Sequence, residues 1–275
     1  MSVSRACVVI VVYAATISKL EEASLEQCVK VLKNHDIALV CPESLNIDQY
    51  LSAFDRYEKL PRVQKFTDAW FESIRAYNSL MLQEFFYRRF SVYEYILIYQ
   101  LDAWVFRDEL EYWCNKKLVY VGAPWFTDRG EVYPFYGNGG FSLRHIRSFI
   151  DLLGGGYQFQ STNWKFLWPQ LNGKNRFNRF AKKVIHAGEM LCCRLSPQTY
   201  CTLNFWDYED FVFAKTFTLL DSERTASFDD AAHFSFERFP EILYSVTKSS
   251  LPFGCHAFAK EGRYFWETWI EALQD

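Results

Sequence analysis

The 275-residue sequence lacks several short motifs that would identify a chemistry. It has no Cys-x-x-Cys pair, which argues against a zinc site and against a thioredoxin-like centre. It has neither Gly-x-Gly-x-x-Gly nor Gly-Lys-Ser/Thr, so dinucleotide binding and P-loop phosphate binding are not indicated. Eight cysteines are present, and several lie inside apolar runs, which is typical of small buried side chains.

The sequence also lacks a long apolar run and a strong charge imbalance. Its N-terminal apolar run, residues 7–12, is far too short to span a bilayer, and no signal peptide is visible. A formal net charge of −3 gives no reason to expect a nucleic-acid partner. We therefore expect a reduced, cytoplasmic protein without a transmembrane segment. Peripheral contact with a membrane stays open, since a basic run at residues 174–183 is either a solvated helix face or an attraction to anionic surfaces.

The strongest local signal is the stretch 95–102, Tyr-Ile-Leu-Ile-Tyr-Gln-Leu-Asp. Its continuous apolar residues predict a central strand that is buried on both faces. The strand ends on Asp102, and the carboxyl edge of an open α/β sheet is where such folds bind ligands. Gln100 and Asp102 are two residues apart and point the same way in an extended chain. Together they can hold a sugar hydroxyl and a divalent cation, although Asp102 can also be a simple loop cap.

The remaining pattern predicts an α/β protein. Residues 6–14 and 37–41 are expected to be strands around a helix that begins at a capping box, Ser24 to Gln27. A helix is expected over 70–90, with Asn78 inside its apolar surface; that amide either bonds to neighbouring backbone or contacts a ligand. Further strands are expected at 118–122 and near 228–237, and further helices at 109–115, 146–153, 211–215 and 264–273. Residues 43–68 and 127–136 are expected to be connections.

In order along the chain, these segments resemble a GT-A type glycosyltransferase, and specifically a family of bacterial and viral transferases described as a domain of unknown function. The resemblance covers nearly the whole chain and depends on six short stretches. They are 77–82 (YNSLML), 98–103 (IYQLDA), 121–125 (VGAPW), 137–144 (GNGGFSLR), 209–210 (ED) and 252–256 (PFGCH). The resemblance implies a Rossmann-like, mostly parallel sheet flanked by helices in a single domain, with 1–104 as the nucleotide-binding half and 105–275 as the acceptor-binding half.

The resemblance also implies roles for the donor end of the site. Enzymes of this type bind Mn²⁺ or Mg²⁺ with an Asp-x-Asp motif after a central strand, and here Asp102 matches the metal-binding position while Gln100 replaces the first acid. His256 matches a late histidine that completes the metal shell, and imidazole and carboxylate both suit Mn²⁺. The residues expected to bind the nucleotide-sugar donor are Val12, Tyr13, Asn78, Gln100, Leu101, Asp102, Gly139 and Gly140.

For the acceptor end, the resemblance implies a base that deprotonates the attacking hydroxyl. Inverting members carry an x-Glu-Asp motif at a helix start, so Asp210 is the expected base with Glu209 beside it. The residues expected to bind the glycan acceptor are Trp125, Phe126 and Asn138.

The function expected from these residues is transfer of a sugar from a nucleotide-sugar, with UDP as a family-level guess, to a hydroxyl of a glycan, with inversion. The alternative is a sugar-binding module on the same scaffold without turnover, which Gln100 in place of an acid favours. A metal-dependent phosphoesterase or nucleotidyltransferase would need several clustered acids or histidines, and no second carboxylate stands next to Asp102 in the sequence.

Overall fold

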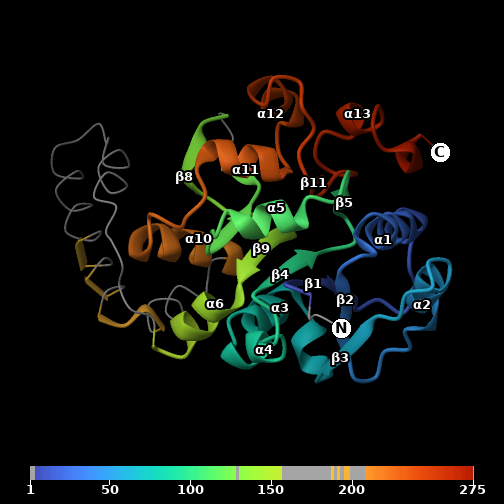
Figure 1. The fold of residues 1–275 in the computed structure, drawn as a ribbon, viewed down its shortest axis with the longest axis horizontal. Coiled ribbons are helices and arrows are strands. Elements are labelled where there is room, and N and C mark those ends of the chain that lie inside the picture. The colour runs from blue at the N-terminus through green and yellow to red at the C-terminus, as the bar shows by residue number, and fades with distance from the viewer. Residues whose placement is uncertain are drawn as a thin grey trace.

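The computed structural model describes residues 4–127, 130–156, 187–188, 191–192, 195–198 and 208–274. Its centre is a six-stranded sheet in the order β3-β2-β1-β4-β9-β6 (Figure 1). Neighbouring strands from β3 to β4 are parallel, whereas β9 is antiparallel to both β4 and β6. In chain order the strands are β1 (Ala6–Val11), β2 (Asp36–Pro42), β3 (Arg62–Phe66), β4 (Tyr95–Tyr99), β6 (Tyr120–Gly122) and β9 (Phe141–His145).

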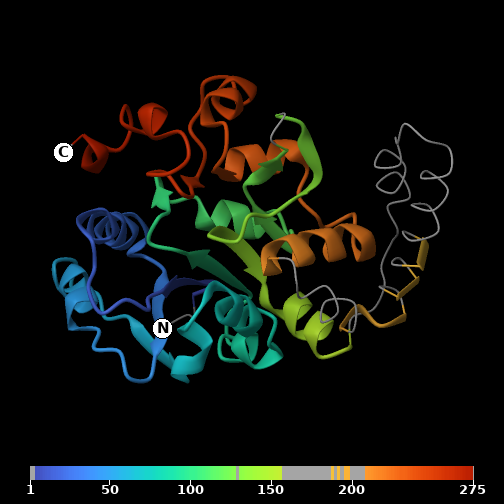
Figure 2. The same ribbon diagram turned by 180° about the vertical axis from the view of Figure 1, so that it is seen from behind.

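Strand β1 shows how the sheet separates two hydrophobic layers, because its side chains alternate between the faces. Cys7, Val9 and Val11 lie in one buried cluster, while Ala6, Val8 and Ile10 lie in the other. Four helices cover the first face (Figure 2). They are α3 (Ile74–Met81), α4 (Glu84–Arg88), α6 (Ile146–Leu153) and α10 (Glu209–Leu220).

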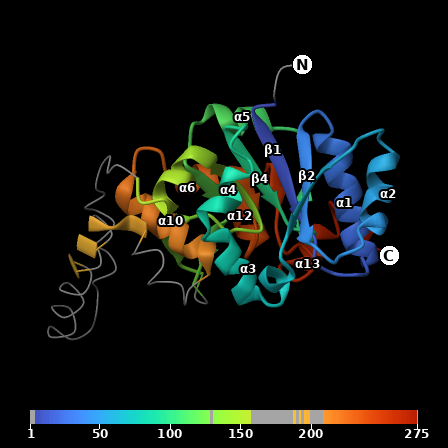
Figure 3. The ribbon, with the colours of Figure 1, turned by 90° about the horizontal axis from the view of Figure 1, so that it is seen from below.

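The second face is covered by α1 (Lys19–Leu32), α2 (Asp48–Asp55) and α5 (Leu110–Asn115). Figure 3 shows β4, β1 and β2 between α4 on one side and α1 on the other. Helix α1 buries Leu25, Cys28, Val29 and Leu32, which follow a helical spacing, against the even-numbered residues of β1. The result is a three-layer α/β/α arrangement in which β1 and β4 are buried on both faces.

A third hydrophobic cluster lies over the C-terminal part of the chain. It surrounds a small sheet in which β10 (Ser235–Phe236) is parallel to β11 (Gly254–Cys255), and β11 is antiparallel to β5 (Trp104–Val105). Its other elements are α11 (Phe228–Phe234), α12 (Pro240–Val246) and α13 (Arg263–Trp266), which appear together in Figure 1. A hairpin of β7 (Pro124–Phe126) and β8 (Val132–Tyr136) packs against α10 and α11.

The predicted strands at 6–14, 37–41, 95–102 and 118–122 are confirmed, each shorter or longer by a few residues at its ends. The helices expected at 109–115 and 146–153 are also confirmed, and a helix starts at Glu209, just before the expected 211–215. Strands from both sides of residue 104 share the central sheet, so the two predicted halves are built on one sheet. The basic run at 174–183 lies outside the described residues.

Several expected boundaries are wrong. The first helix is capped by Ser18, whose side chain accepts from the Glu21 N–H, and not by Ser24, which is buried within the helix. The helix expected over 70–90 is divided into a 3₁₀ turn (Asp68–Phe71), α3 and α4, because Ser73 caps α3 and Gln83 has an extended backbone.

Four other segments also differ from expectation. Residues 43–68, expected as a connection, contain α2 and β3. The strand expected near 228–237 is mainly α11, begun by a capping box between Ser227 and Asp230. The loop expected over 127–136 contains β8, whose aromatic residues are stabilised by pairing with β7. The closing helix ends at Trp266, and a short 3₁₀ turn, Glu271–Leu273, follows.

Candidate active site

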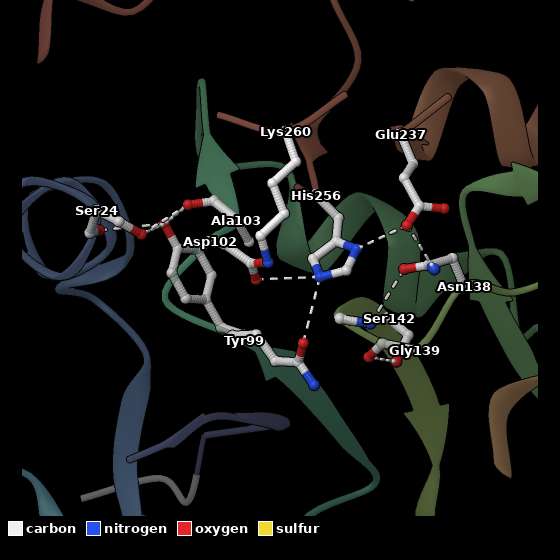
Figure 4. Close-up of polar contacts among 12 residues, drawn as sticks. Ser24, Tyr99, Asp102, Ala103, Asn138, Gly139, Ser142, Glu237, His256 and Lys260 are labelled. Carbon is white, nitrogen blue, oxygen red and sulfur yellow. Dashed lines mark hydrogen bonds and ion pairs between the residues drawn. The ribbon is translucent and has the colours of Figure 1, made fainter. Parts of the chain in front are cut away.

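The candidate site lies where β4 ends and the chain turns through residues 100–103. The turn is closed by the Ala103 N–H, which donates to the Gln100 carbonyl at 2.9 Å. Two hydroxyl groups anchor the turn, since Ser24 and Tyr99 both donate to the Ala103 carbonyl, at 2.6 and 3.0 Å. The buried Ser24 of α1 therefore fixes the position from which Asp102 projects (Figure 4).

His256 lies at the centre of the site, between two carboxylates (Figure 4). Its Nε2 is 3.1 Å from Asp102 Oδ1 and 3.2 Å from Gln100 Oε1. Its Nδ1 is 3.1 Å from Glu237 Oε1. On the outer side, Lys260 Nζ contacts Asp102 Oδ2 at 3.3 Å. Asp102 and Gln100 thus both reach His256, although β4 ends at Tyr99 and the chain between them is not extended.

The charges in this cluster stabilise one another. Burial alone would lower the pKa of His256, but its hydrogen bonds to Asp102 and Glu237 outweigh burial and raise the pKa to about 10. Burial acts to raise the pKa of Asp102, but the contacts with His256 and Lys260 outweigh it and lower the pKa to about 2. Without a bound cation these shifts favour an imidazolium held by carboxylates, and a cation that binds Nε2 has to displace the proton on that nitrogen.

The donor atoms around His256 Nε2 fit a divalent cation. The 3.1 Å from Nε2 to Asp102 Oδ1 matches the ~3 Å edge of an octahedron with metal–ligand distances of about 2.1 Å. Gln100 Oε1 is a third oxygen at the same nitrogen, and Glu237 bonds the other ring nitrogen as outer carboxylates do for metal-binding histidines. Among the described residues no three His, Cys, Asp or Glu side chains form a metal cluster, so phosphate oxygens would have to complete the shell.

Gly139 and Gly140 form a narrow shelf between this cluster and a further carboxylate. The Gly140 carbonyl accepts from the Gln100 N–H at 2.9 Å, and a Cβ atom at residue 140 would overlap the His256 imidazole. On the other side, the Gly139 N–H donates to Asp210 Oδ2 at 2.8 Å. A Cβ at residue 139 would lie 3.2 Å from that oxygen. The two glycines therefore let His256 and Asp210 approach one backbone segment from either side.

Asp210 has the environment of a carboxylate that can exchange a proton near neutral pH. Burial raises its pKa, and the neighbouring carboxylate of Glu209 raises it further, to about 7. The N–H groups of Gly139 and Phe211 act in the opposite direction, since both donate to the carboxylate. Asp210 lies in the first turn of α10 and is partly buried.

Glu209 is engaged differently from its neighbour. Its Oε1 accepts from Arg144 Nη2 at 2.9 Å, and both side chains are almost fully buried. Arg144 also donates to Tyr87 Oη at 2.9 Å and to Ser142 Oγ at 3.2 Å. A buried guanidinium needs a carboxylate partner, so Glu209 has a structural task that occupies it.

Residues 61–256, well over half of the chain, match the model of a family described as "Protein of unknown function (DUF5672)". The chain belongs to this family. The matched region of the DUF5672 chain contains Gln100, Asp102, Gly139, Gly140, Asp210, Glu237 and His256, whereas Ser24 and Lys260 lie outside it. No curated protein matches the sequence.

The fold of this DUF5672 member is similar to solved glycosyltransferases. The apo form of the glycosyltransferase GlyE from Streptococcus pneumoniae TIGR4 has a TM-score of 0.53 at 10% identity, covering 99% of this chain and 61% of GlyE. The mannosyltransferase Ktr4p from S. cerevisiae, in complex with GDP, has a TM-score of 0.49 at 10% identity, covering 83% and 70%. Core-mannan synthase A from Aspergillus fumigatus, in an Mn/GDP form, has a TM-score of 0.46 at 9% identity, covering 82% and 73%. The likeness to GlyE confirms the predicted α/β fold of the GT-A type.

The structure distributes the other predicted donor residues of the DUF5672 chain around the end of β1 and along α3. Tyr13 is exposed just after β1, beside the buried Val12, and Asn78 is partly buried on α3. Leu101 is buried in the turn after β4. The order β2-β1-β4 places a topological switch point between β1 and β4, which brings Tyr13 and Gln100 to the same edge of the sheet. Their donor-binding roles stay predictions.

The three predicted acceptor residues have different environments. Trp125 is partly buried and contacts the rings of Phe135 and Phe211, with centroids 5.9 and 5.6 Å apart. Phe126 is buried, with its ring centroid 5.4 Å from that of Phe239, and its acceptor-binding role stays a prediction. Asn138 is also buried and is bonded to Glu237 and to the Gly140 N–H, which commits its amide to the protein.

Sequence reasoning did not identify the roles of Glu237, Lys260 and Arg144. Glu237 had a weak signal, because it follows Phe-Ser-Phe as His256 follows Gly-Cys, and each is the residue after a short strand. Lys260 and Arg144 had none, because only the fold shows what their charges face.

Among the described residues, no helix has the length and apolar character that a membrane span requires.

Proposed function

We propose that this protein is an inverting glycosyltransferase that transfers a sugar from a nucleotide-sugar to a hydroxyl of a glycan. The observation that carries the proposal is the arrangement at Gly139 and Gly140. A candidate base, Asp210, is bonded to one glycine, and the cluster of His256 and Asp102 lies against the other. Inverting transfer needs a base at the acceptor and charge stabilisation at the leaving diphosphate, and this arrangement supplies both.

At the acceptor end, Asp210 takes the proton of the attacking hydroxyl. The acceptor oxygen forms a bond to the anomeric carbon while the bond from that carbon to the diphosphate oxygen breaks, which inverts the configuration. Each Asp210 oxygen accepts one backbone N–H, and each keeps a further lone pair for the proton. General-base catalysis of this kind contributes ~10²–10⁴-fold. Glu209, paired with Arg144, acts through Asp210 in this proposal.

At the donor end, Asp102 and His256 would hold Mn²⁺ or Mg²⁺, with Gln100 as a neutral oxygen ligand. A divalent cation bound there acts as a Lewis acid that stabilises the departing diphosphate. Lys260, whose side chain is largely exposed, adds positive charge at the mouth of this cluster. We take the donor to be a UDP-sugar, bound across the switch point with Tyr13, Val12, Leu101 and Asn78 on its nucleotide side.

The same proposal places the donor mainly in 1–104 and the acceptor in 105–275, within one domain, and the protein in the cytoplasm. The free thiols of the six described cysteines accord with a reducing compartment.

A non-catalytic nucleotide-sugar-binding module is the second candidate. The neutral Gln100 favours it, because only one carboxylate then faces the cation.

The test is a panel of UDP-, GDP-, CMP- and dTDP-sugars, each with and without Mn²⁺. Thermal shift reports binding, because a ligand that binds the native state stabilises it. Release of the nucleoside diphosphate reports turnover. Turnover that is lost in Asp210→Asn but kept in Asp229→Asn, an exposed carboxylate on α11, would support an enzyme. Binding without turnover for every donor would favour the module, and a transferred sugar with the donor's own anomeric configuration would reject inversion.

A further inference from the structure

Glu237 and His256 lie side by side because two short strands end together. Strands β10 and β11 are parallel, with Phe236 opposite Cys255, and the His256 N–H donates to the Phe236 carbonyl at 2.9 Å. The residue after β10 is therefore Glu237, and the residue after β11 is His256. The side chains meet at 3.1 Å, and each is only 13% exposed. The small sheet thus fixes their separation.

A backbone group sets the direction of the hydrogen bonds that reach His256. The Gly140 N–H can only donate, and it donates to Asn138 Oδ1 at 3.1 Å. The amide of Asn138 must then present Nδ2 to Glu237, and this N–H donates to Glu237 Oε1 at 3.0 Å. The same oxygen contacts His256 Nδ1 at 3.1 Å, so this ring nitrogen must carry a proton. Nε2 is left facing Asp102 and Gln100.

We infer that Glu237, held by Asn138, is a positioning residue that fixes the His256 ring with Nδ1 protonated and Nε2 directed at Asp102. The inference gives Asn138 the role of holding Glu237, in place of the acceptor-binding role expected from the sequence. The effect of Glu237 on the binding of a divalent cation rests on the proposed function, because Nε2 acts as a ligand only if the cation binds there. Removing an outer carboxylate of a ligating histidine typically costs ~10–100-fold in metal affinity.

Three substitutions at one position separate orientation from charge. Glu237→Gln keeps a carbonyl oxygen, and Asn138 forces that oxygen toward His256, so the ring should keep its orientation. Glu237→Ala removes the acceptor. Glu237→Asp keeps the charge but withdraws the oxygen by one methylene, and it serves as the informative variant if the alanine protein does not fold. Glu241→Ala, an exposed carboxylate on α12, is the matched control.

The first readout is the exchange-protected Nδ1–H proton of His256 in the full-length, histidine-labelled protein, assigned by its loss in His256→Gln. We expect this signal in the wild type, Glu237→Gln and Glu241→Ala, and its loss in Glu237→Ala and Glu237→Asp. An unchanged signal in the last two variants would overturn the inference. This readout depends on neither a cation nor turnover.

The second readout is Mn²⁺ binding followed by electron paramagnetic resonance in the presence of UDP. We expect ~10–100-fold weaker binding in Glu237→Ala and Glu237→Asp, and a change of less than about threefold in Glu237→Gln. Equal Mn²⁺ affinity in all variants, with the Nδ1–H signal lost, would uphold the positioning role and reject the cation site of the proposed function. Equal affinity with the signal kept would reject the positioning role.

Discussion

The pH dependence of turnover is the most direct test of Asp210 as the base. An ordinary Asp, with a pKa of 3.8, is ionised throughout the range from pH 5.5 to 8.5, so a base of that kind would give a flat profile. In this site burial and the Glu209 carboxylate raise the pKa of Asp210 to about 7. The reactive carboxylate is then about half populated at pH 7 and about 3% populated at pH 5.5.

The expected result is a kcat/KM that rises about tenfold per pH unit below pH 6.5 and reaches a plateau above pH 8. The assay is release of the nucleoside diphosphate under saturating Mn²⁺, with the donor found in the panel. Asp210→Asn should lower the plateau by at least ~10²-fold, because the amide cannot take the proton. Asp229→Asn should retain both the plateau and the midpoint.

A flat profile between pH 5.5 and 8 in the wild type would refute the assignment, since it would mean that no group with a raised pKa limits the reaction. A profile that falls as pH rises would equally refute it, because a base loses activity on protonation and not on ionisation. Near wild-type turnover in Asp210→Asn would remove Asp210 from the mechanism whatever the profile.

The same shift in pKa has a consequence for stability with a defined sign. The folded protein binds the Asp210 proton more tightly than the unfolded chain, because the folded pKa is the higher one. The contribution of this group to stability is therefore full below about pH 4 and is lost as pH rises through about 7. Asp210→Asn should make stability less dependent on pH in this window, as measured by urea unfolding. An unchanged dependence would contradict the raised pKa.

Three further predictions concern the surroundings of the base. Asp102→Ala should abolish any Mn²⁺-dependent thermal shift in the presence of the donor nucleotide, and a shift of wild-type size would count against the cation site. Arg144→Met leaves Glu209 buried without its partner and should cost ~3–5 kcal/mol in urea unfolding, so a loss below about 1 kcal/mol would show that the pair is dispensable. Gly140→Ala places a methyl group against the His256 ring and should weaken nucleotide binding more than tenfold, while unchanged binding would show that the ring can move aside at little cost.

The parts of the fold that were predictable from sequence are those in which every residue of a segment favours the same secondary structure. Strands β1, β2 and β4 consist almost entirely of buried apolar residues, so the pattern leaves no other interpretation. The acidic pair at 209–210 was placed correctly at a helix start, because two acids in a first turn complement the helix dipole.

The start of the first helix shows why local patterns fail elsewhere. Ser18 and Ser24 are each followed three residues later by Glu or Gln, so both satisfy the capping-box pattern. In the structure Ser18 is the cap, because Ser24 is buried and its hydroxyl donates to the Ala103 carbonyl. That contact joins residues almost eighty positions apart, and no window of sequence contains it.

The same limit explains which site residues were missed. His256 and Asp102 were recognisable because each follows a strand and matches a motif. Glu237 also follows a strand, the two-residue β10, but it matches no motif. Its importance comes from register alone, since β10 pairs with β11 so that Glu237 falls beside His256. Pairing between short strands is decided by the packing around them, which here is the cluster of Phe236, Cys255 and Trp266.

The topology explains why distant segments meet at two glycines. The sheet order places a switch point after β1 and β4, and β9 runs back from that edge, so its first residues face the end of β4. Gly140 then bonds to Gln100, and its missing side chain leaves room for His256, while Gly139 bonds to Asp210 at the start of α10. One peptide segment therefore contacts both chemical ends of the site. The same Gly140 N–H also bonds Asn138, which holds Glu237 against His256. A displacement of this segment should therefore disturb Asp210 and His256 together, whereas changes at Asp210 alone should leave the Nδ1–H signal of His256 intact.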